Sequence, residues 1–219
     1  MRAHQPTSSL KPALLAILLA FPAQQALAAN CTWNPATGNW STASDWSCGI
    51  VPTGGLDTAI IAGGKVVTVN TAQSILNLTN SGGVNIDAFL LTLAGGGSTT
   101  NTGTINVGAG PNPNNAALQV AASHNINNAG GVINISADSV LNQFGSTITG
   151  GTINTTGSGA LVAFNNGNNF LSGAALNGRL DLASNTGIER IVNGLTLGGP
   201  GVVNINSASL LTFEGTQNV

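Results

Sequence analysis

The sequence predicts an all-β protein, a parallel β-helix (solenoid) with a disulfide-stapled N-terminal cap. Short β-type segments recur along the chain, a four-residue phrase returns at intervals in the twenties, and all cysteines and tryptophans precede these repeats. The chain is 42% hydrophobic, and only 5% of its residues are charged. Disordered chains show the opposite balance, so the apolar residues must be buried in a fold.

The N-terminus has the features of a secretory signal. Arg2 and Lys11 precede an apolar run at 13–21, and the small residues at 26–28 predict cleavage after Ala28. This run is too short for a membrane span, which needs roughly 20 apolar residues. We therefore expect an exported protein. The chain divides into a signal peptide at 1–28, a cap segment at 29–64 and β-helix repeats at 65–219.

Both cysteines, Cys31 and Cys48, lie in the cap segment. In an oxidising compartment, two cysteines in one short segment predict a disulfide. A lipid anchor on Cys31 is the alternative, but Asn30 stands where a lipoprotein signal has Gly, Ala or Ser. A Cys31–Cys48 bridge would stabilise the fold by roughly 3 kcal/mol in the chain-entropy model.

The cap also contains all three tryptophans, Trp33, Trp40 and Trp46. Indole rings on a surface could stack on sugars, which gives one candidate glycan-binding site. We favour the other interpretation, in which they cover the apolar end of the first coil and each buries roughly 150–250 Å². At the junction of cap and first coil, Asp57 is expected to accept hydrogen bonds from N–H groups of a turn.

The repeats alternate short runs of Val, Ile, Leu and Thr with Gly, Asn and Ser, a pattern typical of strands and turns. Coils in the low twenties give about seven coils stacked roughly 4.8 Å apart. An antiparallel sandwich, which also has regularly spaced short strands, is the alternative. The repeats stop at Val219 without a turn or cap, which we interpret as the end of a fragment.

A phrase of Gly, one variable residue, Ile or Val, and Asn marks the repeats. Asn side chains in equivalent positions of stacked coils form hydrogen-bonded ladders. We expect such a ladder at the corners of the coils, with the last interval spanning two coils. The phrase occurs at 103–106, 131–134, 151–154 and 201–204, with a shorter form at 83–86, and its asparagines are Asn85, Asn106, Asn134, Asn154 and Asn204.

The cap resembles the opening of large bacterial surface proteins of the autotransporter-passenger and β-helical adhesin type. The resemblance rests on a TW…GNWS…W…G..P…D.A.I pattern between Thr32 and Ile61, followed by Gly/Asn-rich repeats. It implies a right-handed β-helix at the cell surface or outside the cell rather than in the periplasm. An outer-membrane translocator would be a partner but is not found in these residues. The PNPNN segment at 111–115 echoes two-partner-secretion exoproteins, an alternative route.

The charge pattern excludes some partners. After removal of the signal, seven acidic and three basic residues remain, a formal charge of −4, so no basic patch for nucleic acid is available. His124 is the only histidine after the signal and is expected in a loop or at the surface, so zinc sites and catalytic triads lack partners. We expect no cofactor, no metal site and no catalytic residues.

The expected function is that of a structural or adhesin-like passenger, which attaches to extracellular glycans or to the surface of a host or neighbouring cell. The alternative is a carbohydrate-binding or carbohydrate-active β-helix protein, such as a polysaccharide lyase or hydrolase. Such an enzyme needs paired carboxylates or acidic metal ligands beside a base. The only charged cluster contains Asp181 and Glu189 near Arg179 and Arg190, which we interpret as a solvated corner.

Overall fold

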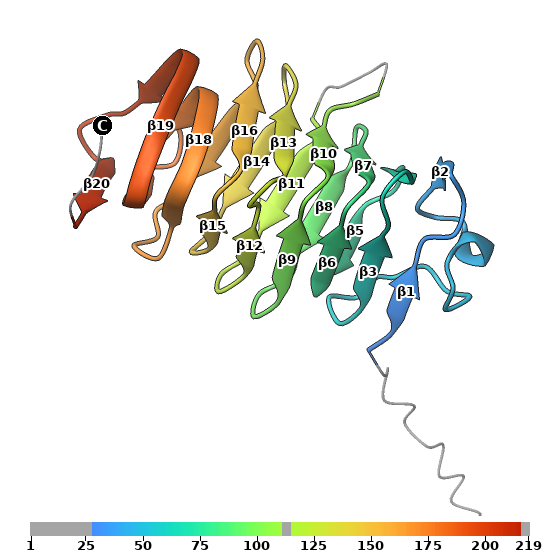
Figure 1. Ribbon diagram of the computed structural model, residues 1–219. Coiled ribbons are helices and arrows are strands. Elements are labelled where there is room, and N and C mark those ends of the chain that lie inside the picture. The colour runs from blue at the N-terminus through green and yellow to red at the C-terminus, as the bar shows by residue number, and fades with distance from the viewer. Residues whose placement is uncertain (1–27, 111–114, 216–219) are drawn as a thin grey trace, which may run out of the picture.

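The computed structural model describes residues 28–110 and 115–215 and forms a parallel β-solenoid (Figure 1). The chain winds through about seven coils, and the strands of successive coils lie side by side. Every pairing between strands of the described residues is parallel, so the sandwich alternative is wrong and the solenoid is confirmed. Most of the predicted signal peptide and the proline-containing part of the PNPNN segment lie outside the described residues.

The strands form three ladders, which we call face A, face B and face C. Face A begins in the cap and shows exposed small polar side chains over much of its length. Its strands are β1 (Asn30–Thr32), β3 (Thr58–Ile61), β6 (Asn77–Asn80), β9 (Ser98–Asn101), β12 (Asn125–Asn127) and β15 (Thr147–Thr149).

Face B carries the phrase found in the sequence, with its third residue buried and its Asn outward. The strands are β2 (Thr37–Asn39), β4 (Val66–Val69), β7 (Gly83–Ile86), β10 (Thr104–Val107), β13 (Val132–Ile135) and β16 (Thr152–Thr155).

Face C closes each coil. Its strands are β5 (Gln73–Ile75), β8 (Leu90–Leu93), β11 (Ala117–Val120), β14 (Val140–Gln143) and β17 (Ala160–Ala163). The two long strands β18 (Phe170–Asp181) and β19 (Ile188–Asn204) each pass through all three faces, and β20 (Leu210–Glu214) adds a last strand to face A.

The core is a set of apolar columns inside the coils. Because side chains alternate along a strand, every second residue points inward. In β10, for example, Ile105 and Val107 are fully buried, and their partners in β13 are Ile133 and Ile135. Burying each Val, Leu or Ile contributes roughly 1.5–3 kcal/mol. Stacking coils therefore makes one continuous core along the length of the solenoid.

The cap joins this core directly. Strand β1 pairs with β3, β2 pairs with β4, and the short 3-10 helix η1 (Ala43–Asp45) lies between β2 and β3 in the chain. Cys31 and Cys48 are bonded, with Cα atoms 5.1 Å apart, which confirms the predicted disulfide. Lys65 donates to the backbone carbonyl oxygens of Trp33 and Asn34. These contacts fix the cap to the first coil.

The glycine of the repeated phrase is required by the close approach of neighbouring coils. A Cβ atom on Gly103 would collide with the backbone oxygen of Gly82, and one on Gly151 with that of Asn128. Of these, only Gly151 also has a positive φ, 66°. The corner between faces A and B therefore needs glycine mainly because a side chain has no space there.

Candidate functional site

The candidate functional site is a flat array of small polar side chains on face A. In four successive strands, β6, β9, β12 and β15, two outward positions flank one buried residue. Neighbouring rungs lie about 4.8 Å apart and the two positions within a strand roughly 6.6 Å apart. We call these eight residues the polar array: Asn77, Thr79, Ser98, Thr100, Asn125, Asn127, Thr147 and Thr149.

The polar array carries no charge, and most of its side chains are exposed. Asn77 Oδ1 accepts a hydrogen bond from Ser98 N at 2.9 Å, and its amide donates to Thr58 at 3.2 Å. Thr79, Thr100 and Thr149 have side-chain hydroxyls without a hydrogen bond to any described residue. The array thus combines fixed amides with hydroxyl groups that are available to a ligand.

A buried asparagine ladder supports one edge of the array. Asn80 donates to Asn101 at 2.8 Å and Asn101 donates to Asn128 at 2.7 Å, and all three are fully buried at the corner of faces A and B. The same amides also contact backbone oxygens on face B, those of Thr104 and Val132. Each rung therefore ties neighbouring coils together and holds the outward side chains in register.

The ladder predicted from the repeated phrase exists, but on a flat face and with one different residue. Asn85, Asn106, Asn134 and Asn154 are joined by amide hydrogen bonds of 2.8 Å on face B. The next rung is Asn177, which donates to Asn154 at 2.9 Å. The predicted Asn204 is wrong as a rung, because it lies on face C opposite Asp181. The corner position belongs to the buried ladder instead.

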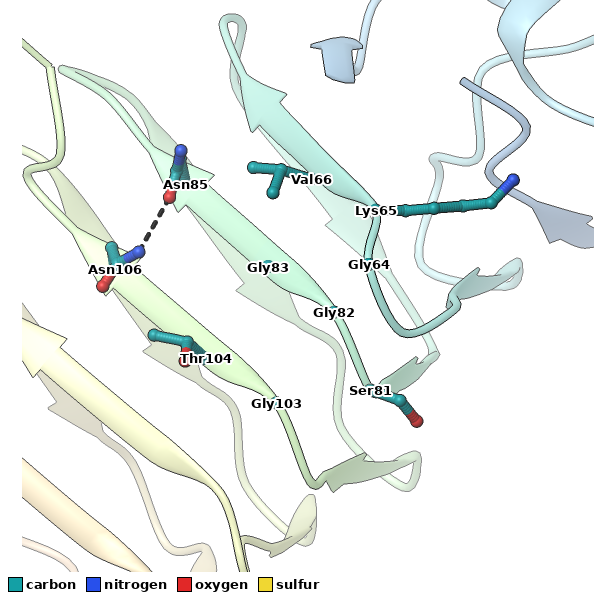
Figure 2. Close-up of a pocket in the computed structure, with 10 residues that line it drawn as sticks. All are labelled: Gly64, Lys65, Val66, Ser81, Gly82, Gly83, Asn85, Gly103, Thr104 and Asn106. Atoms are coloured by element: carbon teal, nitrogen blue, oxygen red, sulfur yellow. Dashed lines mark hydrogen bonds between the residues drawn. The ribbon is translucent and has the colours of Figure 1, made fainter. Parts of the chain in front are cut away.

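Face B also has a shallow groove of about 580 Å³ beside this ladder (Figure 2). Gly82, Gly83 and Gly103 line it without side chains, and Asn85 and Asn106 lie along one side. The Lys65 side chain points away from the ladder toward the cap, where its ammonium group donates to backbone oxygens (Figure 2). The groove therefore offers amides and backbone groups rather than charge.

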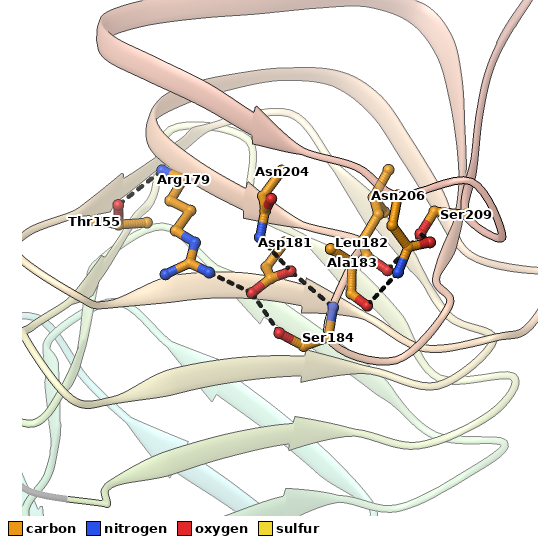
Figure 3. A network of polar contacts seen from close by, with 9 residues as sticks. All are labelled: Thr155, Arg179, Asp181, Leu182, Ala183, Ser184, Asn204, Asn206 and Ser209. Carbon is orange, nitrogen blue, oxygen red and sulfur yellow. Dashed lines mark hydrogen bonds and ion pairs between the residues drawn. The ribbon is translucent and has the colours of Figure 1, made fainter.

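The charged cluster predicted from the sequence is not one cluster. Arg179 and Asp181 form an ion pair with a 2.6 Å contact on face C, where Ser184 and Asn204 also donate to the carboxylate (Figure 3). Burial alone would raise the pKa of Asp181, but the hydrogen bonds from Ser184 and the charge of Arg179 lower it overall. Since Asp181 is only 3% exposed, the interpretation as a solvated corner is wrong.

Glu189 lies apart from this network, inside the solenoid. It is fully buried, and neither carboxylate oxygen has a hydrogen-bond partner. Burial raises the pKa of Glu189 well above its usual range. The neighbouring Arg190 N–H, which would oppose this shift, donates to the Asn169 oxygen. The side chain of Arg190 points outward and pairs with Glu214. Asp181 and Glu189 therefore do not form a carboxylate pair.

His124 lies in the loop between β11 and β12, as one of the two expectations had it, but its side chain is buried in the core and not at the surface. It is fully buried, with one ring nitrogen 3.0 Å from the Thr99 hydroxyl and the other 2.8 Å from the Ala94 oxygen. Burial lowers the pKa of His124, although the contact with Ala94 opposes this. His124 therefore satisfies a backbone carbonyl at a corner of faces C and A.

The tryptophans cover the first coil. Trp33 and Trp40 are fully buried and Trp46 is 2% exposed, with ring centroids 5.1 Å apart for Trp33–Trp46 and 4.8 Å for Trp40–Trp46. Trp40 Nε1 donates to the Pro52 oxygen at 3.1 Å. No ring face is open to a sugar, so the glycan-stacking alternative is wrong.

Asp57 has the predicted role at the junction of cap and coil. Its carboxylate accepts hydrogen bonds from Ala29 N at 2.8 Å and from Thr53 N at 3.0 Å. It is 8% exposed. The same residue's backbone oxygen accepts hydrogen bonds from Leu76 and Asn77. Asp57 thus connects the cap, the start of β1 and the first rung of the polar array.

Two further observations concern the described residues as a set. Over 28–110 and 115–215, no three His, Cys, Asp or Glu side chains gather in a group that could hold a metal ion. Within the same ranges, no helix is long and apolar enough to cross a membrane.

The fold and site define a parallel β-solenoid with an uncharged polar face. No family model, curated protein or solved structure matches this chain.

Proposed function

We propose that this protein is a secreted or surface-displayed structural protein that attaches to glycans or to neighbouring cell surfaces through the polar array. The single observation that carries the proposal is the regular spacing of uncharged hydroxyl and amide groups over four coils of face A. Neutral glycans are rich in hydroxyl groups, which these side chains can both donate to and accept from.

Rigidity makes such an array effective. Parallel strands and the buried ladder of Asn80, Asn101 and Asn128 hold the outward groups in place before a ligand arrives. Pre-organised groups lose little conformational entropy on binding. Each contact is weak, but a ligand that spans several rungs forms many of them at once. This geometry supports the proposal of attachment through length and repetition.

The alternative is a carbohydrate-active enzyme on the same fold. It is less well supported because the buried carboxyls Asp181 and Glu189 lie in separate environments, one in an ion pair and one inside the core. Incubating the purified protein with a panel of polysaccharides tests this alternative. Saturable cleavage of a glycosidic bond would overturn the structural proposal.

The attachment proposal is tested with charged substitutions on the array. We expect Thr100→Arg combined with Thr149→Arg to weaken binding to immobilised glycans or intact cells by about tenfold or more, because the bulky side chains block several rungs of a multivalent surface. Both positions are exposed and lack side-chain hydrogen bonds to described residues, so stability should change by only about 0.5 kcal/mol.

The matched control places the same pair on face C. Thr92 and Asn142 are outward positions two coils apart, as Thr100 and Thr149 are on face A. Thr92→Arg with Asn142→Arg should leave binding unchanged. Equal losses for both pairs would show that general charge or misfolding causes the effect. Protease treatment of intact cells then determines whether the protein is displayed at the surface.

A further inference from the structure

Ala29, the first residue after the predicted cleavage site, contacts the carboxylate of Asp57 through its backbone nitrogen. The backbone nitrogen of Ala29 lies 2.8 Å from Asp57 Oδ1. In the intact chain this nitrogen belongs to a peptide bond and carries one proton. The predicted cleavage site of the signal is the bond directly before it, between Ala28 and Ala29.

The surroundings fix the nitrogen of Ala29 in front of this carboxylate. The Ala29 oxygen accepts a hydrogen bond from Thr58 N at 2.8 Å, so the residue is attached to the ladder that β1 and β3 form. Ala28 is exposed, whereas Ala29 is partly buried against the core. The chain thus passes from solvent into the fold at the predicted cleavage bond.

The carboxylate of Asp57 is held by the fold and not by a charged partner. It accepts from Thr53 N at 3.0 Å and from Ala29 N, both backbone groups. No ion pair of Asp57 occurs in the described residues. An α-ammonium group at Ala29 would supply the missing positive charge, because α-amino groups are protonated below a pH of about 8.

We propose that cleavage after Ala28 completes the cap, because the α-ammonium group released at Ala29 forms an ion pair with Asp57. In this step a signal peptidase hydrolyses the Ala28–Ala29 bond. The oxygen of one water molecule completes the new Ala28 carboxylate, and the two protons of that water pass to the Ala29 nitrogen, which becomes an ammonium group. The amide N–H already donates to an ionised acceptor, and the ammonium group adds a full positive charge, whose attraction to the carboxylate is stronger near a protein surface than in bulk water. Maturation therefore strengthens the junction that joins the cap to the first coil.

The test compares two forms of the protein that differ by one residue, one beginning at Ala29 and one at Ala28. In the longer form the charge lies one residue away, about 3.8 Å along the chain, while the Ala29 amide still donates to Asp57. We expect the form that begins at Ala29 to unfold at a temperature about 2–4 °C higher. Asp57→Asn should abolish this difference, whereas Asp45→Asn, the same change elsewhere in the cap, should preserve it.

Two further measurements keep the proposal testable if Asp57→Asn does not fold. N-terminal acetylation of the form that begins at Ala29 removes the charge and should lower its melting temperature by the same 2–4 °C. The exported protein should begin at Ala29 by mass spectrometry. A different N-terminus, equal melting temperatures for the two forms, or no effect of acetylation would each overturn the proposal.

Discussion

The N-terminal end of the solenoid is covered by three buried indole rings, whereas the last described coil exposes large apolar side chains. Trp33, Trp40 and Trp46 lie over the first coil beside a disulfide. At the other end, five side chains are each half exposed: Leu197, Val202, Ile205, Leu210 and Phe213. Coils of a solenoid contact only their neighbours, and among the described residues no further coil packs on these five side chains.

This difference indicates that stability is distributed unevenly along the axis, with the first coil more stable than the last described coil. The first coil is fixed by ring contacts, the disulfide and the hydrogen bonds of Asp57. The last coil is fixed mainly by strand pairing between β19 and β20, above a buried and unpartnered Glu189. Regions with few buried contacts open with the lowest free energy. We therefore expect opening to begin at β20.

The largest expected effect comes from removing one ring of the cap. Trp40 is fully buried, and its backbone oxygen accepts the Trp46 Nε1 hydrogen bond at 2.8 Å. Trp40→Ala should lower the free energy of unfolding by about 3–5 kcal/mol, because it leaves a cavity in a packed cluster. Urea denaturation with the disulfide oxidised measures this loss.

The control for this substitution is Phe213→Ala at the opposite end. Phe213 is 50% exposed, so its truncation should cost less than about 1 kcal/mol. Similar costs for the two substitutions would show that the two ends are equally packed. In that case the cap would not be the more stable end of the described solenoid.

A smaller effect with the opposite sign is expected at Glu189. Replacing it by Leu should raise the free energy of unfolding at neutral pH by about 1–3 kcal/mol, the cost of an unpartnered buried polar group. Because its folded-state pKa is raised, the contribution of Glu189 to stability is fully present below the unfolded-state pKa of about 4.5 and is lost as pH rises toward the folded-state value. Glu189→Leu should remove this slope in urea denaturation curves recorded across pH.

His124 provides the contrasting slope. Its folded-state pKa is lowered, so its contribution to stability is present above the unfolded-state pKa of about 6.5 and is lost as pH falls through the folded-state value. A variant with His124→Gln should lose that acid-side slope and retain the Glu189 slope.

The Glu189 prediction has its own contradicting outcome. If Glu189→Leu left the pH dependence of stability unchanged, the Glu189 carboxyl would not be buried as the structure shows.

Much of the fold follows from the sequence, because the pattern of short apolar runs between glycines fits parallel coils. The pairing of Cys31 with Cys48 and the role of Asp57 also follow from residue type and position. The incorrect predictions concern which side chains of a coil face the core. His124 and Glu189 stand two residues before Ile126 and Ile191, so strand alternation places each on the inward side. This alternation is visible in the sequence, but the polarity of His124 and Glu189 argued against burial.

The misplaced rung at Asn204 has a different cause. The phrase at 201–204 matches the repeat in letters but belongs to face C. The true rung on face B, Asn177, follows Ala174 where the other coils have glycine. A short phrase in an Asn- and Gly-rich chain recurs by composition, and only strand register distinguishes a structural repeat from a chance one. The polar array was missed for the same reason, since Asn, Ser and Thr occur throughout the sequence.

The smallest expected effect concerns the ion pair of Arg190 with Glu214, which links β19 to β20 in the last described coil. Both side chains are about one-third exposed, so a double-mutant cycle with alanine should give a coupling free energy below about 1 kcal/mol that decreases with added salt. The cycle is needed because Arg190 also lies 4.4 Å from the centre of the Phe170 ring, and that contact would be lost in the single substitution. A coupling above about 2 kcal/mol would mean that charge, rather than strand pairing, holds the last coil in place.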